Sequence, residues 1–147
     1  AETGRLEISS VDRYNRTMWL TSVDLILLQM GQNRITPPQD FTEPYIIKSP
    51  EEGETVQGGM LQVRGVARIL NKNPLLFDCI DQEGNLIASG EVTIHASSDG
   101  ISHIPFEAYL PYQVTSATNV RLSVRQESDN RLPGTISLSS FEITLAP

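Results

Sequence analysis

From residue 45 onward, apolar and polar residues alternate with a period of two along most of the chain. Successive side chains of a β-strand point to opposite faces, so this pattern is typical of strands with one face on a core and the other in water. The clearest segments are 61–69, 92–96, 104–110 and 120–124, and the weaker alternation at 75–80 suits a central strand. Turns rich in Gly, Pro, Asn and Asp separate these segments.

About seven short strands with turns at this spacing predict an all-β fold, an immunoglobulin-like antiparallel β-sandwich. The last strand carries a change of phase, because Ile136 and Leu138 share one parity while Phe141, Ile143 and Leu145 share the other. One extra residue at Ser139–Ser140 would return all five to one face. We therefore expect a β-bulge there.

Residues 1–44 read as a separate N-terminal β extension, with the sandwich domain at 45–147. The pattern favours strands at Leu6–Val11 and Thr17–Met30, paired as a hairpin, and the alternative for Val23–Met30 is a helix capped by Ser22 and ended by Gly31. Residues 32–44 hold three prolines and are predicted to be a linker. The segment 17–29 offers a strand that can add to the sheet edge of a second copy, so we expect a homodimer through the N-terminal strand.

Composition sets limits on partners. The chain has 147 residues, 11 Lys and Arg against 18 Asp and Glu, and a formal net charge of −7. Nucleic acid and anionic lipid surfaces require clustered positive charge, so both are excluded as main partners. Several acids, including Glu51, Glu52, Glu83, Asp99 and Asp129, fall in predicted turns. We expect the single cysteine, Cys79, to be a buried structural thiol.

Few residues of the sequence are candidates for catalysis or metal binding. His95 and His103 flank a predicted hairpin turn at 97–102 with Asp99 between them, but a zinc site needs three or four ligands. Asp78, Asp81 and Glu83 resemble a calcium loop in composition, yet their spacing is too short for an EF-hand, and a hairpin turn at 83–85 accounts for them. The chain lacks the common hydrolase motifs and glycine-rich phosphate loops. We therefore predict no enzyme, no metal site and no cofactor.

Aromatic side chains are the remaining candidates for binding. Exposed Tyr and Trp commonly anchor protein interfaces. Tyr109 and Tyr112 form the densest cluster, and with Trp19 and Tyr14 they make up the predicted interaction surface. The competing interpretation is that Trp19 covers an open end of the sandwich and the tyrosines cap the rims of strands.

The features of 45–145 also occur in the order seen in a known family. A strand ends in the Ser-Pro-x-x-Gly turn of Ser49, Pro50 and Gly53, and a later strand carries Gly65-x-Ala67. Residues 81–85, Gly100 and residues 104–106 follow. The chain resembles the immunoglobulin-like domain of bacterial spore-germination proteins, although it has Gly58-Gly59 where that family often repeats Ser-Pro, and Arg68-Ile69-Leu70 where it tends to show an aromatic and an acidic residue.

The resemblance implies a module of a secreted or lipid-anchored envelope protein, in the extracytoplasmic space, with no catalytic residues. We expect a non-catalytic binding or adhesion module that contacts a protein or a cell-wall polymer, and that meets the membrane only through a lipid anchor since removed. One alternative is a structural spacer of a larger envelope protein. Another is a small hydrolase or metal-dependent enzyme that uses His95 and His103.

Overall fold

The computed structural model describes residues 2–31, 34–35 and 43–147, and within them the regular secondary structure is entirely β-strand. No described helix is present that could be long and apolar enough to cross a membrane. The strands are β1 (Glu2–Val11), β2 (Thr17–Leu27), β3 (Arg34–Ile35), β4 (Tyr45–Ser49), β5 (Thr55–Val56), β6 (Met60–Ala67), β7 (Leu75–Asp81), β8 (Leu86–Val92), β9 (Ile104–Pro111), β10 (Thr118–Glu127) and β11 (Thr135–Leu145).

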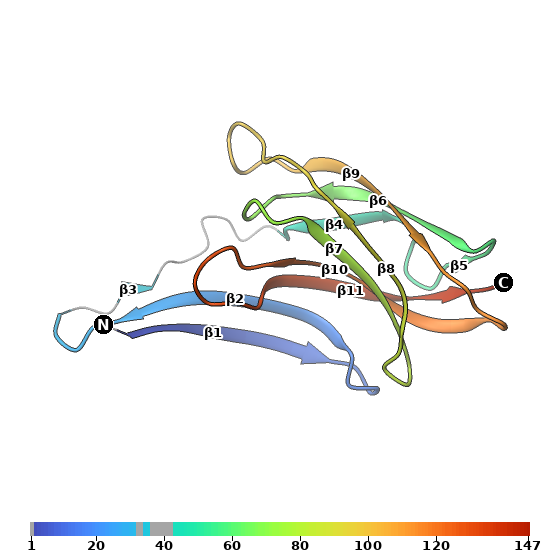
Figure 1. Cartoon of the computed structure of the whole chain (residues 1–147), viewed down its shortest axis with the longest axis horizontal. Helices are drawn as coiled ribbons and strands as arrows, with labels where there is room; N and C mark the ends of the chain where they lie inside the picture. Colours follow the sequence, from blue (N-terminus) through green and yellow to red (C-terminus); the bar gives the residue numbers. More distant parts are fainter. Residues whose placement is uncertain (1, 32–33, 36–42) are drawn as a thin grey trace.

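The strands form two sheets that face each other (Figure 1). The larger sheet has the order β1-β2-β11-β10-β7-β8, with β3 paired to β2 and β5 paired in parallel to β11, and the smaller sheet has the order β4-β6-β9. From β4 on, the chain passes between the two sheets in the manner of immunoglobulin-like sandwiches. The prediction of an all-β antiparallel sandwich with an N-terminal β extension is confirmed.

One hydrophobic core lies between the sheets. Its members come from both layers, and the rings of Phe77 in β7 and Phe106 in β9 meet across it at 5.4 Å between centroids. Every residue of this buried cluster lies between Tyr45 and Leu145. β10 is buried along most of both faces, because the small sheet covers one face and the β1–β2 turn covers part of the other.

The predicted strand at 92–96 is wrong. β8 instead ends at Val92 and pairs with β7, while β9 pairs with β6 in the other sheet. Residues 93–103 therefore connect the two sheets and do not form a hairpin that sets His95 opposite His103. The alternation continues past Val92 because Ile94 still packs against the core.

The predicted β-bulge at Ser139–Ser140 is wrong. β11 runs in unbroken register with β10 from Leu145 to Ser137, and its irregularity lies opposite Gln126 and Glu127. The change of phase has another cause: Leu138 lies on the outer face of the sheet, where it is opposite Leu20 of β2. Ser137 and Ser139 occupy the inner face instead, where Ser137 is buried and Ser139 bonds to Glu43.

The N-terminal residues form the predicted hairpin. β1 and β2 pair from Glu2 with Leu27 to Ser10 with Trp19, so the helix alternative for this segment is wrong. β2 then joins the sandwich through Trp19, Leu20 and Thr21, which pair with β11. β2 is consequently an interior strand, and the free edge expected at 17–29 belongs to β1. The predicted linker lies mostly outside the described residues.

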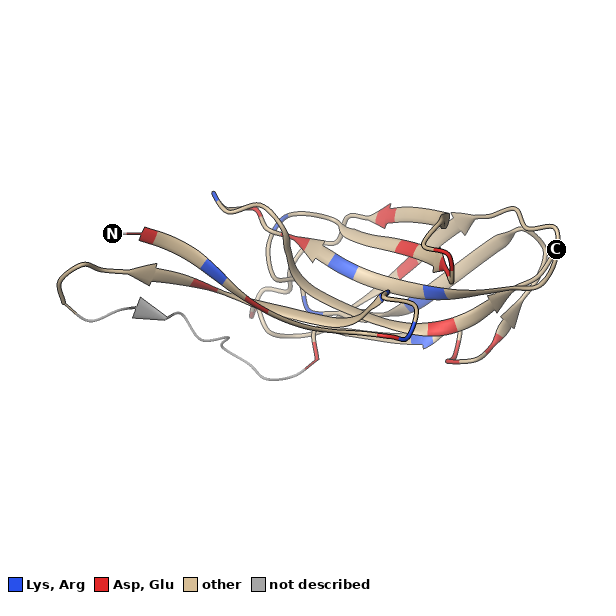
Figure 2. Cartoon of the chain, turned by 90° about the horizontal axis from the view of Figure 1, so that it is seen from below, with Lys and Arg blue, Asp and Glu red and all other residues tan. Residues whose placement is uncertain are grey.

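The hairpin extends past the two-layered part of the molecule. Figure 2 shows its N-terminal end reaching beyond the sandwich, away from the C-terminus. Paired residues of an antiparallel ladder lie on the same face of the sheet. Val124 faces the core and is paired with Ser139, which is paired with Trp19, which in turn is paired with Ser10. Trp19 and Ser10 of the hairpin therefore lie on the same inner, core-facing side of the sheet as Val124.

Candidate binding surface

The inner face of the hairpin is an apolar surface that the small sheet does not cover. We call it the apolar strip; its members are Leu6 and Ile8 of β1 and Trp19, Val23, Leu25 and Leu27 of β2. Leu6, Ile8, Trp19 and Leu27 expose 52%, 53%, 45% and 43% of their surface, and Val23 and Leu25 are half-buried. A sheet normally buries such a face, so its exposure sets this surface apart from single apolar side chains elsewhere.

The opposite face of the hairpin has a different character. Arg5 and Glu7 of β1 lie there beside Asp24 of β2, interspersed with apolar residues. On the inner face, by contrast, Glu2 lies opposite Leu27 at the open end of the hairpin, and no charged side chain occurs between Gly4 and Ser10 of β1 or between Trp19 and Leu27 of β2. The strip therefore favours an apolar ligand over a charged one.

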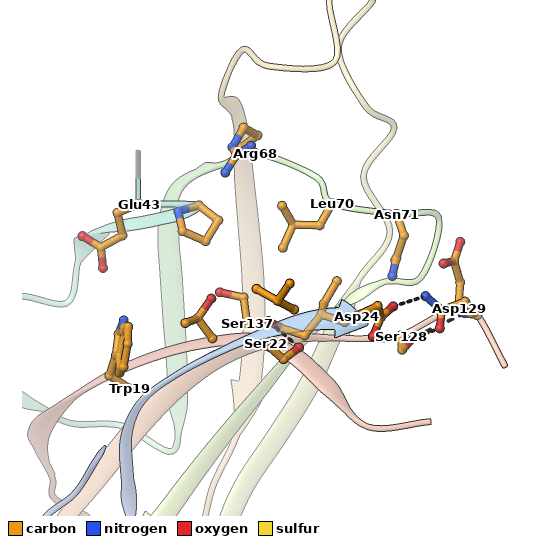
Figure 3. A pocket seen from close by; sticks show the side chains of 15 residues that line it. Trp19, Ser22, Asp24, Glu43, Arg68, Leu70, Asn71, Ser128, Asp129 and Ser137 are labelled. Atoms are coloured by element: carbon orange, nitrogen blue, oxygen red, sulfur yellow. Dashed lines mark hydrogen bonds between the residues drawn. The ribbon is translucent and has the colours of Figure 1, made fainter. Parts of the chain in front are cut away.

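At its base the strip opens into a groove of about 830 Å³ (Figure 3). Trp19, Thr21 and Val23 line it from β2, and Ser137 lines it from β11. Pro44, Arg68 and Leu70, which flank the small sheet, face them from the other side, and Ser128–Asn130 close one end. The groove forms where the two sheets diverge and the hairpin leaves the core.

Hydrogen bonds fix the groove walls. The Gln126 side chain is fully buried; its Oε1 accepts a bond from the Leu70 backbone N–H (3.0 Å), and its Nε2 donates to the carbonyls of Asn71 and Asn73 (3.2 and 2.6 Å). On the other side Ser139 Oγ donates to Glu43 Oε1 (2.8 Å). Both walls are thus held to β10 and β11 before any ligand arrives, which lowers the entropic cost of binding.

The loop between β10 and β11 is tied to the hairpin by Arg5. Its Nε donates to Asp24 Oδ1 (2.8 Å), while its other nitrogens donate to Ser128 Oγ (2.9 Å) and the Pro133 carbonyl (3.2 Å). The bond from Arg5, opposed by partial burial, leaves the pKa of Asp24 below its usual value, and a bond from Asn130 adds to this. Asp24 is therefore a charged anchor of the loop.

A second polar group, the outer-face ion cluster, consists of Asp12, Arg16, Arg121 and Glu142. Asp12 Oδ2 accepts bonds from Arg16 Nε (2.8 Å) and Arg121 Nε (2.9 Å), and both arginines also pair with Glu142. Burial alone would raise the pKa of Asp12, but these bonds and the backbone N–H groups of Arg16 and Tyr14 hold it well below the usual range. The cluster satisfies its own charges and fastens the β1–β2 turn onto β10 and β11.

The predicted interaction surface is not one surface. Tyr109 is 56% exposed on the outer face of the small sheet, and Trp19 lies in the groove. Tyr14 lies in the β1–β2 turn, 4.7 and 5.1 Å from the guanidinium groups of Arg13 and Arg16. The prediction for Tyr112 is wrong: it is buried, and its hydroxyl donates to the carbonyls of Val56 and Ala146 (3.0 and 2.9 Å).

The histidines and acidic residues considered as metal ligands are exposed or bonded to other residues of the chain. His95 is exposed, and His103 Nε2 lies 2.8 Å from the Glu43 carbonyl oxygen. Asp81 accepts bonds from Glu83 and Asn85 in the β7–β8 turn, whereas Asp78 pairs with Arg125 on the opposite face. Among the described residues, no three His, Cys, Asp or Glu side chains gather as a metal site would require.

Cys79 is fully buried, as predicted. Desolvation, with a smaller contribution from the charge of Asp78, raises the pKa of its thiol to about 12. A thiol with that pKa is almost entirely protonated at neutral pH and so is a poor nucleophile. Cys79 therefore belongs to the core.

The sequence interpretation missed Leu6 and Ile8 as site residues, although it named Trp19 and predicted the strand that holds Val23 and Leu25. The signal available in the sequence was the length of the predicted strand. β2 spans 11 residues, whereas β4, an edge strand of the small sheet, spans five. A long two-stranded ribbon beside shorter covering strands must leave part of its apolar face without cover.

Comparisons with models of known protein families, with curated proteins and with solved structures gave no match.

Proposed function

We propose that this protein is a non-catalytic binding module that holds a partner protein against the apolar strip and the adjoining groove. The observation that carries the proposal is the continuation of the sandwich's inner face onto an uncovered hairpin. Exposed apolar surfaces of this kind, bordered by polar residues, are characteristic of protein-binding sites.

The groove supports a protein partner over a cell-wall polymer. Its polar groups are largely engaged with one another, as Asp24 is with Arg5 and Asn130 and as Glu43 is with Ser139. The hydroxyl groups of a saccharide need side-chain hydrogen-bond partners, and these groups have few to spare. An apolar segment of a protein needs buried area instead, which Leu6, Ile8 and Trp19 offer.

The proposed location is extracytoplasmic, in a secreted or envelope-anchored protein, and it rests on the sequence resemblance alone. The spacer alternative requires no exposed binding surface, and the hydrolase alternative requires convergent groups near His95 and His103. The apolar strip therefore favours the binding module over both.

Trp19 makes the proposal directly testable, because it is the chain's single tryptophan. We expect a tryptophan-free peptide rich in Leu and Phe to shift the emission of Trp19 to shorter wavelength in a saturable titration. Ile8 is 53% exposed, so covering the rest of its side chain contributes about half of the 1.5–3 kcal/mol of full burial, and Ile8→Ser should weaken this binding about three- to tenfold.

Leu86→Ser is the matched control, because Leu86 is similarly exposed (59%) but lies at the start of β8. It should leave the peptide affinity unchanged. Soluble cell-wall fragments form the other arm of the titration. A shift with those fragments and none with the peptide would favour the polymer alternative, and no shift with either would favour the spacer.

A further inference from the structure

β1 is the end strand of the large sheet: one of its edges pairs with β2, and no described strand pairs with the other edge. It is ten residues long and contains no proline. The other sheet edges are shorter or interrupted: β9 contains Pro105 and Pro111, Pro50 follows β4, and the ladder of β8 is irregular opposite Cys79 and Ile80. Natural proteins usually protect long edges with such devices. β1 is the edge that can accept a continuous new strand.

We propose that β1 pairs antiparallel with β1 of a second copy of this chain, about a two-fold axis at Leu6. A two-fold axis perpendicular to the sheet keeps the inner face of each copy on the same side. Paired residues must share a face, and residues on one face of β1 are all even-numbered or all odd-numbered. The numbers of any two paired residues must therefore add to an even total. This restricts the dimer to a few registers.

Charge selects among those registers. With Leu6 opposite Leu6, Arg5 lies opposite Glu7 of the second copy, and the same pair forms again across the axis. Centring the axis on residue 5 would set Arg5 against Arg5, and centring it on residue 7 would set Glu7 against Glu7. Like charges directly opposite each other destabilise a pair of strands, whereas opposite charges stabilise it. The register at Leu6 also overlaps the strands from Glu2 to Ser10.

The existing contacts of Arg5 fit this arrangement. Asp24 lies opposite Arg5 within the hairpin and bonds to it, and Arg5 also bonds to Ser128 and Pro133, so Glu7 of the second copy acts on Arg5 through its charge and replaces none of these bonds. Adding Glu7 of the second copy gives a row of alternating charge, Asp24, Arg5 and Glu7, across three neighbouring strands of the outer face. Because the new contact uses the strand edge, the apolar strips of both copies stay open on one side of a continuous sheet. The inference thus goes beyond the proposed function and does not depend on it.

Cysteine cross-linking tests the register. Paired residues of antiparallel strands have Cα atoms about 4.5–5.5 Å apart, within the range of a disulfide. Leu6→Cys should therefore give a covalent dimer on mild oxidation, visible on a non-reducing gel. Ile8→Cys is the matched control on the same face, because its two copies would lie about 13 Å apart along the strands. Native Cys79 is fully buried and should not react.

Analytical ultracentrifugation tests the proposed pairs of Arg5 with Glu7 by measuring the association constant of the dimer. A single pair of strands buries little area, so the dimer should be weak and is best measured at protein concentrations up to about 1 mM. Glu7→Arg should lower the association constant about tenfold, since it turns two attractive pairs into repulsive ones. Glu83→Arg makes the same change of charge in the exposed β7–β8 turn and should have no effect.

A chain that stays monomeric across this range would overturn the proposal. So would a dimer in which Leu6→Cys does not cross-link, or in which Ile8→Cys cross-links equally fast. A monomer that still binds the apolar peptide through Trp19 would overturn the dimer alone and leave the proposed function standing.

Discussion

At the scale of single residues, the attachment of the hairpin depends most on Asp12. Its side chain is 9% exposed and accepts bonds from two buried arginines that come from different parts of the chain, Arg16 in the turn and Arg121 in β10. Asn15, which has φ of 63°, closes the turn that brings Arg16 back toward Asp12. None of this was visible in the sequence, because Arg121 occupies an outward position of its strand and outward arginines normally face water.

Replacing Asp12 should therefore be costly. Asp12→Asn leaves Arg16 and Arg121 with less compensating charge, and removing one partner of a buried pair costs about 3 kcal/mol. Chemical denaturation should show this loss in the free energy of unfolding. Asp129→Asn makes the same chemical change at an exposed loop position and should alter stability by less than about 0.5 kcal/mol. Equal effects of the two substitutions would contradict the role given to Asp12.

The same contacts predict how stability depends on pH. The pKa of Asp12 is lower in the folded state than in the unfolded chain, where it is about 3.9. The unfolded state therefore binds the proton more readily, so the stabilisation is fully present above about pH 4 and is lost as the pH falls further. Denaturation midpoints measured from pH 7 to pH 2 should fall steeply below about pH 4. The fall should be shallower in Asp12→Asn, and parallel curves would contradict this explanation.

At the scale of elements, β6 shows why one strand tolerates only glycine at its centre. A Cβ added at Gly65 would lie 2.3 Å from the Ile46 carbonyl oxygen and 2.8 Å from Cζ of Phe106. The first neighbour is backbone and cannot turn aside. This is a physical reason for glycine at position 65 of this chain.

Gly65→Ala should consequently destabilise the protein by about 2–3 kcal/mol, at the upper end of the cost of overpacking. Gly4→Ala is the matched control, because Gly4 also lies within a strand and an added Cβ would meet nothing within 4 Å. Thermal unfolding of both variants in dilute solution measures the difference. A Gly65→Ala protein as stable as Gly4→Ala would show that β4 and β9 can separate from β6 at little cost.

The sequence predicted the strands whose two faces have different surroundings. Leu61 and Val63 of β6, and Phe106 and Leu110 of β9, alternate with polar residues because one face meets the core and the other meets water. It failed where that contrast is absent. The outer side of β11 carries Leu138 against Leu20, so apolar residues occur at both parities and imitate a bulge. The candidate site was only partly predictable, because cover by another sheet is a property of the tertiary fold.

At the scale of the whole molecule, the sandwich holds a complete core without the hairpin. Every member of the buried cluster lies between Tyr45 and Leu145. The hairpin joins the sandwich through a short ladder at Trp19–Thr21, the outer-face ion cluster and the bonds of Arg5 to the β10–β11 loop. The division at residues 44 and 45 predicted from the sequence implies that the second part folds alone.

We therefore expect a chain of residues 45–147 to unfold cooperatively, with a lower midpoint than the full chain because Arg121 loses Asp12. Circular dichroism during heating measures both properties. A truncated chain without a cooperative transition would show that the hairpin is an integral layer of the fold, and the two-part description would then be wrong.

The inner face of the hairpin is the proposed binding surface. Amide chemical-shift mapping tests it most directly, with the isotope-labelled protein titrated by the apolar, tryptophan-free peptide. Binding at this surface should give shifts confined to β1, β2 and the groove, and greatest around Ile8, Trp19 and Val23. Shifts centred instead on the outer face of the small sheet around Tyr109, with the hairpin unchanged, would contradict it.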